Sequence, residues 1–313
     1  MTKLNTLQAS ATHRCLIYGA PKTGKSLLAG KLAEYYDLIW IDMENGYDVL
    51  FQLPPAWQER VDIISLPDTR SYPVAIETCL KIVKGSVEIC HEHGKVKCML
   101  CIKAERDACK TAIQEEHGDV HNNYFTDLNL PALRDTGKVV VFDSMTQLTN
   151  SAIAHITKSQ PDDYKLTYDD WGNLGKLMDI FLSHIQQAGY NVIVISHETQ
   201  ADAEDKKTKL VPVAGTRNFS RNAAKYFDHV IYAEVKNKQH VFSSSTVAST
   251  WILSGSRTNV AIEDYPGAGL LPIFKPELYP RLESKVQVKI NNPSGGKAQA
   301  NSVLARLRAN TKN

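Results

Sequence analysis

The chain has 313 residues, with 36 Lys and Arg against 34 Asp and Glu and a hydrophobic content of 43%. That hydrophobic content is enough to fill a sizeable core, which argues against a chain that stays disordered or needs disulfides to fold. No apolar run approaches the roughly 18 residues of a membrane span, and the N-terminus lacks the charged and apolar regions of a secretory signal. We therefore expect a cytoplasmic protein without a membrane partner, folded around one core domain over residues 1–284.

Charge separates the end of the chain from its body. Residues 285–313 contain six basic residues and no acidic one, so 30 Lys and Arg stand against 34 Asp and Glu before position 285. A basic, flexible tail behind a mildly acidic body suits an anionic partner such as nucleic acid, the alternative being a tail that is only solvated.

Apolar runs alternate with segments of helical periodicity along most of the chain. In chain order, the predicted strands are residues 14–18, 38–41, 61–65, 138–143, 191–196, 230–235 and 250–253. The predicted helices follow the glycine-rich loop 19–26 and lie at about 73–83 and 172–188. The last two strands are expected to be antiparallel and joined through 236–240. This alternation predicts a three-layer α/β fold with a mostly parallel sheet.

Residues 85–125 differ from the rest in composition, because they are rich in Cys, His and charged residues and show little apolar periodicity. We interpret them as an insertion that binds a structural Zn²⁺. Two pairs, Cys90 with His93 and Cys98 with Cys101, have the spacing of ligands to tetrahedral zinc. Rival ligands are Cys109, His91, His117 and His121, and the alternative is a set of unligated thiols.

Residues 19–26, Gly-Ala-Pro-Lys-Thr-Gly-Lys-Ser, match the P-loop pattern between a predicted strand and a predicted helix. Glycines let backbone N–H groups converge on phosphate oxygens, and the helix N-terminus adds positive potential. Lys25 would reach the β- and γ-phosphates, and the Ser26 hydroxyl would ligate Mg²⁺. The predicted ATP-binding residues are Gly19, Ala20, Pro21, Lys22, Thr23, Gly24, Lys25, Ser26 and Leu27.

Polar residues at the ends of three other predicted strands complete the pattern expected for ATP hydrolysis. Asp143 ends an apolar run, where a P-loop protein places the carboxylate that holds Mg²⁺ through water. Glu44 follows the strand 38–41 and would orient or deprotonate the attacking water, the alternative being a loop cap. His197 ends the strand 191–196, where it would sense the γ-phosphate, the alternative being a polar group that is only satisfied at the strand end.

Two regions near the C-terminal end of the core carry further candidates. Arg257 would contact the transferring phosphate, in cis or from a neighbouring subunit, and its alternatives are DNA or a surface carboxylate. In the polar stretch 199–226, Phe219 or Tyr226 would stack on bases, the alternative being a charged surface loop. The predicted contacts to single-stranded DNA are Lys206, Lys207, Lys209, Arg217 and Arg221.

Four ordered motifs carry a resemblance to a known family. They are GAPKTGKS at 19–26, WIDMENG at 40–46, VVVFDSMTQL at 139–148 and VIVISHE at 192–198. Over about residues 12–275 the chain resembles the RecA-like ATPases and, more closely, the phage-encoded AAA/RecA-type proteins of the Sak group, which assist single-strand annealing and recombination.

The resemblance implies roles for the residues that match the motifs. Lys25 and Ser26 would bind phosphate and Mg²⁺, Asp143 would be the Walker B acid, Glu44 the catalytic carboxylate and His197 the sensor. The chain departs from RecA at His197, where RecA has an amide, and it lacks that family's long DNA-binding C-terminal domain.

These features favour a Mg-ATP-dependent ATPase acting on single-stranded DNA in phage recombination, annealing or replication. We expect a homo-oligomer in the host cytoplasm, with a single-strand-binding or annealing protein as a further candidate partner. One alternative is a nucleotide-gated scaffold or loader with little turnover. The other is a nucleoside or nucleotide kinase, which is disfavoured because the zinc-bound lid of such kinases follows the central strands, whereas these cysteines precede strand 138–143.

Overall fold

The structure is a computed structural model, and it describes residues 12–66, 68, 73–90, 125–201, 209–245, 252–257 and 261–279. All of these residues belong to one compact unit, Met1–Tyr279. The predicted basic tail and most of the predicted zinc insertion lie outside the described residues. Among the helices that are described, none is long and apolar enough to cross a membrane.

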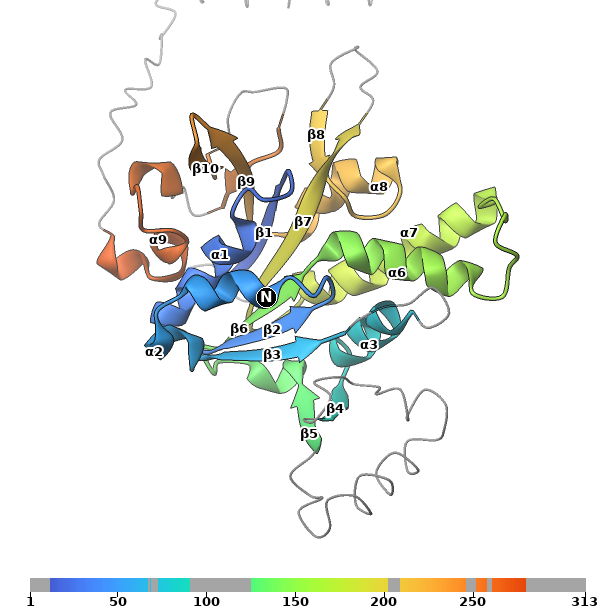
Figure 1. Ribbon diagram of the computed structural model, residues 1–313, viewed down its shortest axis with the longest axis horizontal. Helices are drawn as coiled ribbons and strands as arrows, with labels where there is room; N and C mark the ends of the chain where they lie inside the picture. The colour runs from blue at the N-terminus through green and yellow to red at the C-terminus, as the bar shows by residue number, and fades with distance from the viewer. Residues whose placement is uncertain are drawn as a thin grey trace, which may run out of the picture. The chain divides into compact units, whose positions relative to one another are not determined.

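A mostly parallel sheet forms the centre of the fold (Figure 1), with strand order β10-β9-β1-β7-β6-β2-β3. Within it, β9, β1, β7, β6, β2 and β3 run parallel, while β10 and the short β11 pair antiparallel with β9. The strands of this sheet are β1 (Arg14–Gly19), β2 (Leu38–Asp42), β3 (Val61–Ser65), β6 (Val139–Asp143), β7 (Asn191–Ala201), β8 (Lys209–Pro212), β9 (His229–Lys236), β10 (Gln239–Ser243) and β11 (Gly255–Ser256). A separate antiparallel pair joins β4 (Ser86–Cys90) to β5 (Phe125–Asn129).

Helices cover both faces of the sheet, and each face buries its own apolar cluster. On one face, α3, α6 and α7 pack on alternate strand residues such as Phe142 and Val194. On the other, α1 and α9 pack on the intervening residues, such as Val141 and Ile195. The helices are α1 (Lys25–Gly30), α2 (Pro55–Gln58), α3 (Val74–Ile82), α6 (Met145–Thr157), α7 (Tyr168–Gln186), α8 (Arg217–Asn222) and α9 (Leu271–Phe274). The central strands are buried on both sides, so their sequences are continuously apolar, and the predicted α/β fold with its layers is confirmed.

Local sequence explains where the long helix α7 starts. The Thr167 side chain accepts from the backbone of Asp170, whose carboxylate accepts in return from the Thr167 N–H, at 2.8 Å. This capping box satisfies N–H groups that would otherwise have no partner at the helix N-terminus. The helix therefore begins at Tyr168, four residues before the predicted start near 172.

The structure corrects the predicted hairpin at the edge of the sheet. The antiparallel partners of β9 are β10 and the short β11, whereas the predicted partner was the strand 250–253. Asn237 and Lys238 form a tight turn with positive φ values of 50° and 65°, which returns the chain at once. Of residues 250–253, Ile252 makes a single bridge to Leu210, and 250 and 251 lie outside the described residues.

Gly19 lies where two strands approach each other too closely for a side chain. A Cβ atom at this position would lie 2.0 Å from the carbonyl oxygen of Ala233 on β9. We expect Gly19→Ala to destabilise the fold by about 3 kcal/mol or more, because β9 would have to move away from β1. Gly172→Ala is the matched control, since Gly172 lies at an exposed position of α7 and a Cβ atom there would meet nothing within 4 Å. Urea denaturation gives the free energy of unfolding of both variants. Equal values for Gly19→Ala and Gly172→Ala would contradict the close approach of β1 and β9.

Candidate nucleotide-binding site

The P-loop follows β1 and leads into α1, as the motif predicts. Gly24 has a left-handed conformation (φ 83°), which favours glycine, and helix α1 begins at the next residue. The Lys25 side chain folds back over the loop, where Nζ donates to the carbonyl oxygens of Gly19 (3.1 Å) and Ala20 (2.7 Å). Burial lowers the pKa of Lys25, although the carboxylates of Asp143 and Glu44 oppose this effect. The loop thus holds a buried ammonium group at its centre.

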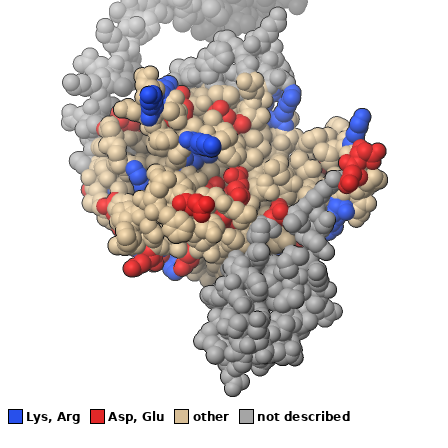
Figure 2. All heavy atoms as spheres, viewed as in Figure 1, with Lys and Arg blue, Asp and Glu red and all other residues tan. Residues whose placement is uncertain are grey.

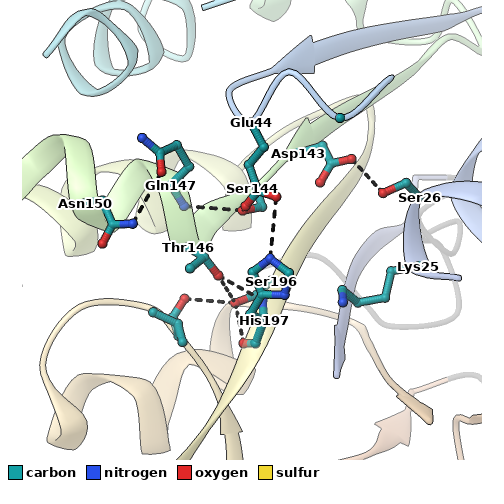
Figure 3. A network of polar contacts seen from close by, with 12 residues as sticks. Lys25, Ser26, Glu44, Asp143, Ser144, Thr146, Gln147, Asn150, Ser196 and His197 are labelled. Atoms are coloured by element: carbon teal, nitrogen blue, oxygen red, sulfur yellow. Dashed lines mark hydrogen bonds and ion pairs between the residues drawn. The ribbon is translucent and has the colours of Figure 1, made fainter. Parts of the chain in front are cut away.

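Asp143 faces the P-loop across one intervening strand. It pairs with Ile195 of β7, which in turn pairs with Ile17 of β1. The Ser26 hydroxyl donates to its Oδ2 at 2.8 Å (Figure 3), although the two residues are 117 positions apart in sequence. Burial raises the pKa of Asp143 to about 7, and the hydrogen bond from Ser26 only partly offsets this. The carboxylate therefore lies in a setting where a cation would stabilise its charged form.

Glu44 stands beside this pair, on the loop that follows β2. The loop is held by Asp42, whose Oδ1 accepts from the backbone N–H groups of Glu44 and Gly46, each at 3.2 Å. The Glu44 carboxylate accepts from the Ser144 hydroxyl and lies 3.5 Å from Nε2 of His197 (Figure 3). Burial raises the pKa of Glu44, but the contacts with His197 and Ser144 outweigh it and hold that pKa below its usual value. Glu44 is therefore a carboxylate at neutral pH.

His197 is fixed by the helix that follows Asp143. Its backbone N–H donates to Oγ1 of Thr146 at 2.8 Å, and its carbonyl accepts from Val213 at 2.9 Å. The neighbouring Ser196 hydroxyl donates to the carbonyl of Val213 at 2.9 Å. The His197 ring thus contacts the catalytic carboxylate candidate Glu44, while the His197 backbone is bonded to Thr146 and to Val213, the residue after β8.

These side chains surround one cavity of about 570 Å³. Its described lining consists of residues 21–27 of the P-loop, together with Glu44, Gly46, Val49, Gln52, Asp143, Ile195, His197 and His240. The structure thus brings together Lys25, Ser26, Glu44, Asp143 and His197, which are far apart in sequence. No group of three or more His, Cys, Asp or Glu among the described residues could hold a metal alone. Mg²⁺ bound at Ser26 and Asp143 would therefore need oxygens of the nucleotide or water, which fits its preference for octahedral oxygen ligands.

Arg257 is not brought to this cavity. It follows β11, whose Ser256 pairs with His229 at the start of β9, whereas the P-loop residue Gly19 pairs with Ala233. Four residues along a strand correspond to about 13 Å. Within its own chain, Arg257 instead pairs at 2.9 Å with the Asp228 carboxylate, whose side chain is only 12% exposed.

The predicted DNA contacts are only partly described. Lys206 and Lys207 lie outside the described residues, as does the side chain of Lys209, the first residue of β8. Arg217 and Arg221 lie on α8, just after the β7–β8 hairpin.

The two aromatic candidates for base stacking pack on each other instead of standing free. Tyr226 is 3% exposed, and its hydroxyl donates to Asp179. Phe219 stacks on its ring, with centroids 6.0 Å apart. Tyr226 is therefore a buried structural residue, and the prediction that it stacks on bases is wrong.

The predicted zinc ligands cannot be placed. Cys90 ends β4, but its side chain and the whole of His93, Cys98, Cys101 and Cys109 lie outside the described residues. The rival ligands His91, His117 and His121 also lie outside them.

Sequence reasoning missed four residues of the site: Asp42, Ser144, Thr146 and His240. Ser144 and Thr146 flank Met145, the first residue of α6, a helix that was not predicted. The signal for Ser144 was its place as an N-cap directly after Asp143, because Ser is a favoured N-cap residue. His240 had no signal, since only the observed hairpin brings it to the cavity.

The raised pKa of Asp143 gives the nucleotide-free protein a specific pH dependence. The folded pKa of about 7 exceeds the unfolded value, so the folded chain keeps a proton that the unfolded chain releases between about pH 4 and pH 7. Asp143 therefore opposes folding increasingly as the pH rises through this window. We expect Asp143→Asn to be more stable than the unsubstituted protein at pH 8, by up to about 4 kcal/mol, with the difference vanishing near pH 4. Urea denaturation in EDTA across this range checks the sign, and a variant that is less stable at pH 8 would contradict it.

A family model described as an AAA domain matches residues 11–261. Among solved structures, the chain is similar to a prototypical ATPase from the type III secretion system of pathogenic bacteria, with 14% identity and a TM-score of 0.38. That match covers 72% of this chain and 52% of the other, so the chain spans about half the length of that ATPase. No curated protein matches. Since the family model spans most of its length, the chain belongs to the AAA domain family.

Proposed function

We propose that the protein is a Mg-ATP-dependent ATPase that acts on single-stranded DNA as a homo-oligomer. The observation that carries the ATPase part is the position of Glu44. Its ionised carboxylate is held by Ser144 and lies beside His197, at the cavity that also contains Lys25. A fixed, charged carboxylate beside a P-loop is the group needed to activate water for attack on a phosphate.

The residues of the P-loop would bind the triphosphate. Nζ of Lys25 would exchange the carbonyl oxygens of Gly19 and Ala20 for phosphate oxygens, which carry more negative charge. Ser26 and Asp143 would hold Mg²⁺, which would neutralise charge that develops on the phosphates. This arrangement also relieves the buried charge of Asp143, since that carboxylate would then face a cation.

Glu44 would accept a proton from the attacking water. Its lowered pKa keeps it ionised at neutral pH, and the Ser144 hydroxyl fixes one of its oxygens. His197 would report whether the γ-phosphate is present, because its ring contacts Glu44 on one side and its backbone is fixed by Thr146 on the other.

The DNA part of the proposal rests on the path of β7. Beyond His197 this strand leaves β1 and continues as a hairpin with β8, pairing Glu198–Ala201 with Lys209–Pro212. The hairpin brackets the basic residues Lys206 and Lys207, and α8 with Arg217 and Arg221 follows it. On the face drawn in Figure 2, the basic and acidic side chains of the described residues are interspersed. Lys and Arg residues that follow a nucleotide sensor in the sequence would suit phosphate contacts that respond to ATP.

The resemblance to the Sak group motivates the assignment to phage recombination, annealing or replication, in the host cytoplasm and together with a single-strand-binding or annealing protein. The test is ATP hydrolysis measured with and without single-stranded DNA. Stimulation by DNA supports the proposal. Phosphoryl transfer to a nucleoside would indicate a kinase, and binding without turnover would indicate a scaffold.

We also propose a structural Zn²⁺ held by Cys90, His93, Cys98 and Cys101, because their spacing suits tetrahedral coordination. Purified protein is expected to contain about one zinc per chain, and Cys98→Ser with Cys101→Ser to remove it. Elemental analysis measures this, with Cys79→Ser, a buried core thiol, as the control. A fully folded preparation without zinc would remove this part of the proposal.

A further inference from the structure

The β9–β10 hairpin brings to the phosphate cavity a side chain that no sequence motif marks. His240 lies on β10, opposite Val235 of β9 and two residues after the turn residue Lys238. The two positive φ values of this turn are those of a two-residue hairpin, whose geometry fixes the register of β10. The place of His240 is therefore set by backbone pairing and not by a loose loop.

The His240 ring lies directly against the P-loop. A Cβ atom on Gly24 would be 3.1 Å from its Nδ1 and 3.3 Å from its Cγ. The ring lines the cavity together with Lys25 and Ser26. Within the described part of the chain, the ring nitrogens make no hydrogen bond or ion pair, so they are available to a ligand in the cavity.

The negative charges that would meet in the cavity favour a further hydrogen-bond donor to the phosphates. A triphosphate brings several negative charges to a cavity whose lining already contains the carboxylates of Glu44 and Asp143. The lysines among the described lining residues are Lys22 and Lys25. An imidazole always has at least one N–H to donate, whether it is neutral or protonated.

We propose that His240 is a nucleotide-contacting residue whose ring donates a hydrogen bond to a phosphate oxygen. This inference rests on the proposed binding of ATP at the P-loop. The hairpin would then form one wall of the phosphate site, in addition to the walls that the P-loop and the strand ends provide.

The chain offers a matched control on the same hairpin. His240 also lines a second cavity of about 560 Å³, bounded by β10 and residues 262–269. Its neighbour Gln239 lines this second cavity but not the phosphate cavity. Gln239→Ala therefore shows what disturbing the hairpin or the second cavity does by itself.

The experiment is titration calorimetry of the full chain with Mg-ATP and, separately, with Mg-tripolyphosphate, which has no nucleoside. His240→Ala is expected to weaken both ligands about tenfold, because a hydrogen bond to a charged phosphate is lost. His240→Gln keeps an N–H donor and is expected to recover most of the affinity, and Gln239→Ala to match the unsubstituted protein.

Unchanged affinities in His240→Ala would overturn the inference, as would an equal loss in Gln239→Ala or in His240→Gln. A loss for Mg-ATP alone would overturn it too, because the contact would then be with the nucleoside. If the unsubstituted protein bound neither ligand, the proposed function itself would fail. Binding that is lost in Lys25→Ala but kept in His240→Ala would refute only this inference.

Discussion

Glu44→Gln is expected to lower the rate of ATP hydrolysis by about 10²–10⁴-fold while leaving ATP affinity within a few-fold of the unsubstituted protein. The amide keeps the size of the side chain and can still accept from Ser144, so the loop held by Asp42 should persist. What is lost is the negative charge that would take a proton from water. Phosphate release at saturating Mg-ATP, together with equilibrium binding of ATP, separates the two effects.

Asp48→Asn is the matched control for this variant. Asp48 is exposed and lies four residues after Glu44, outside the phosphate cavity, so the same change from acid to amide should leave hydrolysis unchanged. If Glu44→Gln hydrolysed ATP at the normal rate, another group would have to activate the water. The close contact of Glu44 with His197 would then serve sensing alone.

Lys25→Ala is expected to weaken binding of Mg-ATP by at least about 30-fold without unfolding the protein. Lys25 is 6% exposed, and its ammonium group donates to two carbonyl oxygens of the P-loop. The substitution therefore removes the main buried positive charge of the site. Removing one partner of a buried, hydrogen-bonded charge pair costs about 2–5 kcal/mol. Calorimetric titration gives the affinity, and thermal unfolding of the nucleotide-free protein verifies the fold.

Lys176→Ala provides the comparison, because Lys176 is an exposed cation on α7. It removes the same charge from the protein and should leave ATP binding unchanged. Unaltered ATP affinity in Lys25→Ala would refute the assignment of the phosphate site, whatever the behaviour of Glu44→Gln.

The parts of the site that sequence could predict are those in which one short segment contains the whole signal. The P-loop is such a segment, because its glycines, Lys25 and Ser26 act through neighbouring backbone. Asp143 was predictable since an unbroken apolar run before an acid indicates the buried strand that carries it. The strand 191–196 was found for the same reason, although β7 continues to Ala201 as a hairpin strand.

The parts that sequence could not predict depend on contacts between distant segments. The Ser144 hydroxyl donates a hydrogen bond to Glu44, which lies 100 residues away in the sequence. Neither residue type by itself predicts that contact. Helix α6 was missed because Met145–Thr157 is rich in Thr and other polar residues, whose weak helix propensity is overridden by packing against α3 and α7. The distance of Arg257 from the cavity of its own chain could not be predicted for a related reason: following a strand does not reveal at which edge of the sheet that strand ends. Its predicted contact with a phosphate of a neighbouring subunit stays a prediction.

The antiparallel pair β4 and β5 has a consequence for how this chain can change length. Cys90 and Phe125 are register partners, so the backbone leaves this two-stranded ladder at Cys90 and rejoins it directly opposite. Adjacent strands lie about 5 Å apart, so the two ends of the segment between Cys90 and Phe125 are held close together. Because β4 and β5 form a sheet of their own, we expect a change in the length of that segment to leave the strand order of the main sheet unchanged. The segment between β4 and β5 is thus a site at which sequences can be inserted or removed, since a two-residue turn is enough to connect the two strand ends.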